Sequence, residues 1–139
     1  MTRQGELHRE TKETTIDVAL VLEGHGATTI STGIPFFDHM LEQLGKHGGF
    51  DLAIECEGDL QIDTHHTIED VGIALGECLK QALGAKAGVR RFASVSVPLD
   101  AALVDVALDL SGRPYLHHEP PFVGEPFLLA DPGSDPPPA

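Results

Sequence analysis

Alternating apolar and polar residues predict most of the strands in this chain. In residues 14–22, the apolar side chains Ile16, Val18 and Leu20 fall on one side, as in a half-buried strand. Residues 27–32 are rich in β-branched side chains and follow a glycine-containing turn, so we expect a strand that returns along the first. The predicted strands are, in order, 14–22, 27–32, 50–57, a short one at 60–63, 92–98 and 102–110, with a brief resumption at 115–116.

Two segments instead carry apolar residues at helical spacing. The first helix is expected at about 37–46 and ends in a run of glycines, and the second is expected at 65–83 and stops at Gly84. Strands mixed with two helices predict an α+β fold, with the helices packed on one face of a mixed sheet. We assign residues 1–118 to this domain. Residues 119–139 hold seven of the ten prolines and no Lys or Arg, so we expect a disordered or loosely extended tail.

The charge balance limits the classes of partner. The formal net charge is −13, which argues against nucleic acid and anionic membranes because phosphate binding needs clustered cations. A small phosphate ester needs only a few local donors and stays possible. The sequence contains no run of about 18 apolar residues, so it predicts no membrane-spanning helix. The first residues do not have the pattern of a signal peptide. Cys56 and Cys78 both fall at apolar positions, which favours buried free thiols in a reducing cytosol.

The candidate chemistry centres on residues 63–70, which read DTHHTIED. If a helix begins near His65, then His65 and Glu69 stand one turn apart on one face. His66 points about 100° away around the helix axis. Imidazole and carboxylate together suit Mn, Fe or Zn. The alternative is a helix start with two exposed histidines, in which Asp63 or Thr64 serves as the N-cap.

A second histidine lies at the start of the first predicted helix. His39 and Gln43 are one turn apart and can face the same site. If the two helices pack side by side, their first turns bring His39 and His66 together. The alternative is an exposed His39 with no ligand role.

Three further charged residues do not indicate a function by themselves. Glu13 precedes the first predicted strand and by itself is one more surface acid. Arg91 and Arg113 lie at strand–loop junctions, where a forked guanidinium can hold a phosphate oxygen. Solvated surface arginines are the alternative.

Four motifs together resemble one family. Residues 33–41 (GIPFFDHML), residues 63–70, Arg91–Phe92 and residues 109–115 (DLSGRPY) resemble the imidazoleglycerol-phosphate dehydratases of histidine biosynthesis. The resemblance runs from about Arg9 to Tyr115, with the motifs in the family's order. It implies two similar α+β halves in tandem, each like the second domain of a ribosomal protein. It also implies a cytoplasmic homo-oligomer with its sites at subunit boundaries, and no role for nucleic acid or membrane.

The same resemblance implies the reaction and the ligands. The reaction is loss of water from imidazole-glycerol phosphate, a small phosphate ester, to give imidazole-acetol phosphate, with two manganese ions per complete site. Carried over residue by residue, His39 and His66 bind one metal, and His65 with Glu69 binds the other. Glu13 is implied as an acid/base group near the substrate, with His39 and Glu69 also at the catalytic centre.

The substrate contacts are likewise implied by the resemblance. Glu13 and His65 touch the substrate, Gln43 contacts its polar atoms, and Arg91 with Arg113 holds its phosphate. The family continues through a second half with its own HHxxE motif, which this sequence lacks. Two readings therefore stay open. One is a manganese-dependent hydro-lyase, and the other is a truncated, inactive half-domain that only binds divalent metal weakly.

Overall fold

The structure, a computed structural model, describes residues 2–119. The predicted tail therefore lies, except for Glu119, outside the described residues. The described chain forms two compact units, called here the first unit, up to Gly84, and the second unit, from Ala85 onward. Its elements are β1 (Gln4–Glu10), β2 (Thr14–Val21), β3 (Thr28–Ser31), α1 (Pro35–Gly48), β4 (Asp51–Gly58), α2 (His65–Leu83), β5 (Phe92–Leu99) and β6 (Ala102–Asp109).

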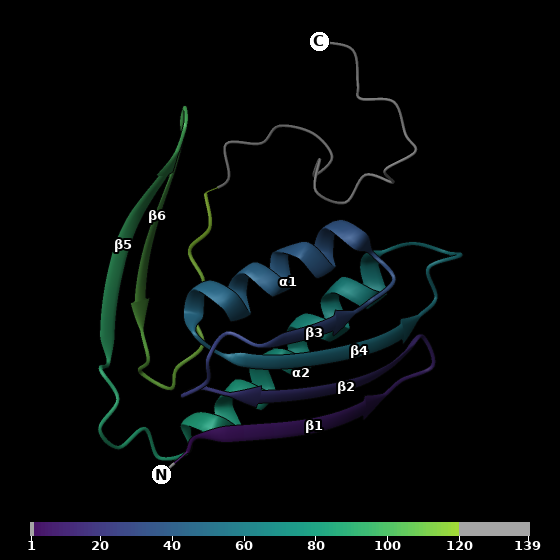
Figure 1. The fold of residues 1–139 in the computed structure, drawn as a ribbon, viewed down its shortest axis with the longest axis horizontal. Helices are drawn as coiled ribbons and strands as arrows, with labels where there is room; N and C mark the ends of the chain where they lie inside the picture. The colour runs from purple at the N-terminus through teal and green to yellow at the C-terminus, as the bar shows by residue number, and fades with distance from the viewer. Residues whose placement is uncertain (1, 120–139) are drawn as a thin grey trace. The chain divides into compact units, whose positions relative to one another are not determined.

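The first unit is a four-stranded sheet covered by two helices. The strand order is β1-β2-β4-β3, with β3 parallel to β4 and the other pairs antiparallel (Figure 1). Alternate residues of β2 and β4 are buried, while their neighbours, such as Asp17 and Glu55, are exposed on the other face. The helices cover the buried face, where Leu41 of α1 and Val71 of α2 join one hydrophobic core with these strands. The predicted α+β fold, with helices on one face of a mixed sheet, is confirmed.

One strand was missed and three strand predictions were wrong. The sequence reading missed β1, whose inward positions are Gly5, Leu7 and Arg9, a set too mixed to show an alternation. Residues 27–32 do not return along β2, because β4 lies between β2 and β3 in the sheet. Residues 60–62 form a turn, so there is no strand at 60–63, and none is found at 115–116.

The second helix was predicted almost to the residue. It begins at His65 and ends at Leu83, and Gly84 follows with a positive φ of 51°. Thr64 occupies the N-cap position without a side-chain hydrogen bond. Instead Asp63 Oδ1 accepts the backbone N–H of His65 at 2.9 Å, so Asp63 satisfies one of the free donors of the helix start. Neither this helix nor any other in the described part of the chain is long and apolar enough to cross a membrane.

The second unit contains the antiparallel hairpin of β5 and β6. Every residue of both strands is exposed. An isolated two-stranded hairpin buries little apolar surface and is at best marginally stable. Within residues 85–119, the part of the second unit that the structure describes, no further strand or helix packs on this hairpin.

Both cysteines are free and buried, as predicted. Burial raises the pKa of the Cys56 thiol to about 11, with a further contribution from the charges of Asp70 and Glu57. Burial also raises the pKa of the Cys78 thiol. Because the thiolate is the reactive form, we expect neither thiol of the folded chain to react with iodoacetamide at neutral pH. Mass spectrometry should find both modified after unfolding in guanidinium, and rapid labelling of the native chain would contradict this burial.

Candidate metal and substrate site

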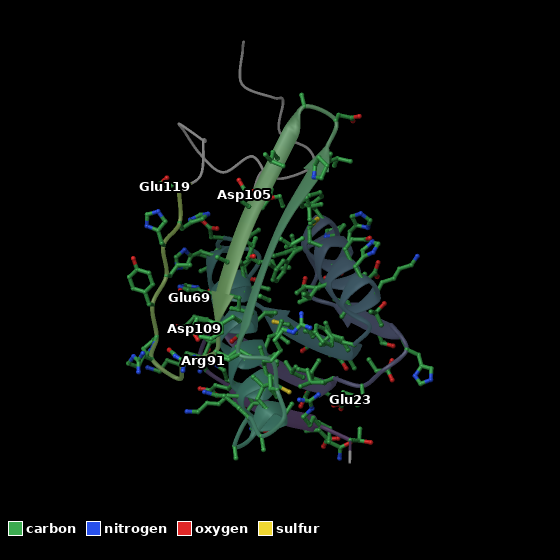
Figure 2. The ribbon with its side chains drawn as sticks, turned by 90° about the vertical axis from the view of Figure 1, so that its left-hand side faces the viewer. Glu23, Glu69, Arg91, Asp105, Asp109 and Glu119 are labelled. Atoms are coloured by element: carbon green, nitrogen blue, oxygen red, sulfur yellow. The ribbon has the colours of Figure 1, made fainter. Side chains whose placement is uncertain are left out.

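The first turn of α2 presents the predicted His/Glu pair. His65 Nε2 lies 2.8 Å from Glu69 Oε2, and both side chains are exposed. The helical period alone brings them together, because residues four apart are neighbours on one helix face. Figure 2 labels Glu69 on this helix. The pair offers one imidazole and one carboxylate to a common point in solvent.

His66 has a partner that the sequence reading missed. Its Nδ1 lies 2.8 Å from Oδ2 of Asp59, the residue directly after β4. The hydrogen bond to Asp59 raises the pKa of His66, and the negative charges of Glu13 and Asp70 raise it further. With a proton held on Nδ1 by the carboxylate, neutral His66 keeps its lone pair on Nε2, where a ligand can bind.

Asp59 is largely buried beside the contact between β4 and α2. Its side chain is only 14% exposed, and its Oδ1 is buried without a hydrogen-bond partner among the described residues. The preceding residue, Gly58, lies against α2 so closely that a Cβ there would stand 2.1 Å from Thr67 Oγ1. Only the tertiary contact between β4 and α2 brings Asp59 to His66, so no local sequence pattern indicates this role.

A second carboxylate fixes α2 against the β1–β2 hairpin. Thr14 Oγ1 donates to Asp70 Oδ2 at 2.6 Å, and Arg9 Nη2 donates to Asp70 Oδ1 at 3.4 Å. The loop between the two strands carries Glu13, whose backbone N–H donates to Thr11 Oγ1 at 3.1 Å. Thr11 Oγ1 also lies 3.4 Å from Asp70 Oδ2. Asp70 therefore ties the loop that carries Glu13 to the helix that carries the histidine pair.

The candidate residues of α1, His39 and Gln43, contact neighbours on their own helix. His39 is exposed, with its ring centroid 6.5 Å from that of Phe36. Gln43 Oε1 lies 3.0 Å from His47 Nε2, one turn further along the same helix. Within residues 2–119, no three His, Cys, Asp or Glu side chains form a group that could hold a metal ion. The pairing of His39 with His66 at one metal thus stays a prediction.

The two candidate arginines belong to the second unit. Arg91 is already paired, because its Nε lies 2.7 Å and its Nη2 3.3 Å from the two carboxylate oxygens of Asp109 (Figure 2). This fork raises the pKa of Arg91 and lowers that of Asp109. Arg113 lies exposed in the loop after β6, where its backbone N–H donates to Ser111 Oγ at 3.1 Å. Their role at a phosphate stays a prediction.

The donor chemistry on α2 fits a divalent metal as a partial ligand set. His65 and Glu69 supply nitrogen and oxygen within 2.8 Å of one another. The Nδ1–H of His66 donates to the Asp59 carboxylate. A metal-ligating histidine usually makes such a bond with the ring nitrogen that does not bind the metal. Such a mixed set of imidazole and carboxylate suits Mn, Fe or Zn.

Comparisons with known proteins agree on one family. The sequence model of imidazoleglycerol-phosphate dehydratase matches residues 32–127. A relative from Acidothermus cellulolyticus with that name is 60% identical over 123 residues, which cover 88% of this chain and 60% of the relative. One from Parafrankia is 58% identical over 125 residues, covering 89% of this chain and 64% of the relative. The chain thus spans less than two thirds of the length of these relatives.

Solved structures of the same family resemble the described fold. The crystal structure of imidazoleglycerol-phosphate dehydratase from Staphylococcus aureus matches with a TM-score of 0.69 at 30% identity, covering 87% of this chain and 68% of that one. The enzyme from Pyrococcus furiosus matches with a TM-score of 0.62 at 38% identity, covering 78% of this chain and 57% of that one.

Proposed function

Because the chain belongs to the imidazoleglycerol-phosphate dehydratase family, we propose that it serves the dehydration of imidazole-glycerol phosphate to imidazole-acetol phosphate in histidine biosynthesis. The observation that carries the proposal is the first turn of α2. There a His65–Glu69 pair stands beside His66, whose Nδ1 is held by Asp59. This is a donor arrangement for a divalent metal, placed within the part of the chain that the family model matches.

We assign the metal ligands as the resemblance implies. His65 and Glu69 would hold one manganese ion, and His39 with His66 would contribute to the other. When bound, a divalent cation lowers the pKa of a ring N–H of the substrate's imidazole. Asp59 supports this role, because it keeps the proton on Nδ1 of His66 and leaves Nε2 as the donor atom.

The remaining side chains bind the substrate or move protons. Glu13 is exposed on a loop fixed through Thr11, and its charge acts on His66, which supports a role as acid/base group near the reacting carbon. The phosphate would be held by Arg113 and by Arg91, whose guanidinium is kept in one orientation by Asp109. Gln43 would contact the substrate's polar atoms.

One observation favours a second function. The described residues contain no group of three side chains that could hold a metal ion. On this alternative, the chain binds divalent metal weakly through two-ligand sets and does not turn over substrate. We place either form in the cytoplasm, in keeping with two free thiols.

Manganese titration followed by an activity assay tests the proposal. Calorimetry of the purified chain should give binding that His65→Ala and Glu69→Ala weaken to a similar degree, about 10-fold or more, since both are assigned to one ion. His8→Ala is the matched control, because His8 also pairs with a carboxylate, Asp17, at 2.7 Å but lies on the opposite face of the sheet. Equal affinity in all three variants and the unsubstituted chain would overturn the metal assignment.

The assay then separates the two functions. Formation of imidazole-acetol phosphate by the manganese-loaded chain would establish the dehydratase. Binding without turnover would establish the alternative. Light scattering with and without manganese would report whether copies assemble, as a homo-oligomer with sites at subunit boundaries requires.

A further inference from the structure

Lys86 has a backbone conformation that a lysine rarely adopts. It lies in the loop between α2 and β5 with a φ of 59°, in the left-handed region that glycine and asparagine favour. Asp100 is the other non-glycine residue with a positive φ within residues 2–119, but it lies in the hairpin turn between β5 and β6, where aspartate is usual. A strained residue keeps its conformation only where its surroundings fix it, so we ask what holds Lys86.

The side chain of Lys86 binds the loop that follows β6. It is half-buried, and its Nζ donates to the carbonyl oxygen of Leu110 at 3.3 Å. The N–H of the same Leu110 donates to the carbonyl oxygen of Arg91, directly before β5, at 3.0 Å. The backbone of Leu110 is therefore held on both sides, by Arg91 at its N–H and by Lys86 at its carbonyl.

The loop that is fixed at Leu110 carries Arg113. A Cβ built on Gly112 would lie 3.0 Å from Nζ of Lys86, so the ammonium group stands directly against the residue before Arg113. Ser111 Oγ accepts the backbone N–H of Arg113 at 3.1 Å, which connects Arg113 to the residue after Leu110. A displacement of Leu110 would therefore displace Arg113 as well.

Three cations act on one carboxylate in this part of the second unit. Arg91 donates to both oxygens of Asp109, and this bonding is the main cause of the lowered pKa of Asp109 (Figure 2). The positive charges of Arg113 and Lys86 lower the same pKa further. One carboxylate neutralises only one of three cations, so positive charge is in excess here, in a chain whose formal net charge is −13. Such a local excess suits an anion.

We infer that Lys86 is a positioning residue for the phosphate-binding arginines, because it holds the loop that carries Arg113 against the Arg91 end of β5. The inference rests on the proposed function in one respect, the assignment of Arg91 and Arg113 to the substrate's phosphate. Lys86 acts by pre-organisation, since an arginine that is ordered in advance loses less conformational entropy when it binds. A solvated surface lysine would need neither the strained backbone nor the bond to Leu110.

Binding of inorganic phosphate to the complete 139-residue chain tests the inference. Lys86→Gly removes the donor and also relieves the strained φ, so urea unfolding should show a chain that stays folded. We expect calorimetry to give a phosphate affinity about 5-fold or more below that of the unsubstituted chain. Arg90→Met is the matched control, because it removes one exposed positive charge from the same loop and leaves the bond to Leu110 intact. Its affinity should fall by less than about 2-fold, as expected for a screened charge.

The order of the loop distinguishes positioning from direct contact with phosphate. Nitrogen-15 relaxation of the phosphate-free chain should show that the amides of residues 111–113 become more mobile in Lys86→Gly but not in Arg90→Met. Lys86→Arg keeps a charged donor on a long side chain, so it should keep both the order of these amides and the phosphate affinity close to those of the unsubstituted chain.

Three results would overturn the positioning role of Lys86. One is an equal effect of Lys86→Gly and Arg90→Met on phosphate affinity, since charge alone would then explain it. Another is a loss of affinity with unchanged order at residues 111–113, because Lys86 would then contact phosphate directly. The third is an unsubstituted chain that does not bind phosphate, which would also remove the assignment of Arg91 and Arg113. The test involves no turnover, so a chain that binds phosphate as expected without dehydrating substrate would refute the dehydratase alone.

Discussion

Replacing Gly5 by alanine is expected to destabilise the first unit by about 3 kcal/mol, the upper end of the usual cost of overpacking a core. The added Cβ would lie 2.3 Å from the carbonyl oxygen of Cys78. That atom belongs to the backbone of α2, so it cannot rotate away as a flexible side chain would. Either β1 or the helix must shift. Urea unfolding followed by circular dichroism measures the change in free energy.

Gly72→Ala in the same helix is the control for this prediction. Gly72 is exposed on α2, and no atom lies within 4 Å of a Cβ built there. Alanine is the better helix former, so this variant should gain up to about 1 kcal/mol. A Gly5→Ala chain as stable as the unsubstituted one would mean that β1 and α2 are further apart than described.

Gly5 also explains why β1 could not be predicted from its sequence. Strand prediction depends on alternating apolar side chains, which β2 and β4 have in full. In β1 the inward positions are a glycine that admits the helix and an arginine that binds Asp70, with Leu7 between them. Both exceptions serve α2, which lies about 60 residues later in the chain. A local pattern contains no information on such a partner.

The position of β3 illustrates a second limit. The glycine-containing turn after β2 suggested a hairpin, because antiparallel strands joined by a short turn usually pair. In the structure β3 instead pairs in parallel with β4, and α1 connects the two. Parallel neighbours require such a crossover, and a helix is its usual form. The succession of strand, helix and strand from 27 to 57 was visible in the sequence and was the better guide.

The contacts within the candidate site also differ in how far they could be predicted from the sequence. The His65–Glu69 pair was predictable because the helical period alone creates it. The partner of His66 was not, since Asp59 reaches it only through the packing of β4 against α2. The proposed sharing of a metal between α1 and α2 depends on distances that no sequence period encodes.

Asp59→Ala is expected to lower the affinity for manganese about 10- to 100-fold, the usual effect of removing the carboxylate behind a ligating histidine. Without Asp59 Oδ2, the proton of neutral His66 is free to move to Nε2, which removes the donor atom. The pKa of His66 should also fall, because the hydrogen bond to Asp59 is the main cause of its increase. Nitrogen-15 NMR of the metal-free chain measures tautomer and pKa, and calorimetry measures manganese binding.

Asp17→Ala provides the matched control, because Asp17 Oδ1 lies 2.7 Å from Nδ1 of His8 in the same kind of pair on the opposite face of the sheet. It should lower the pKa of His8, which Asp17 raises, and leave manganese affinity unchanged. Asp59→Ala should itself fold, since the buried Asp59 Oδ1 has no hydrogen-bond partner to lose among the described residues. If both variants bound manganese as the unsubstituted chain does, His66 would not be a ligand supported by Asp59. The histidine pair would then be an exposed helix start, as its sequence alone also allowed.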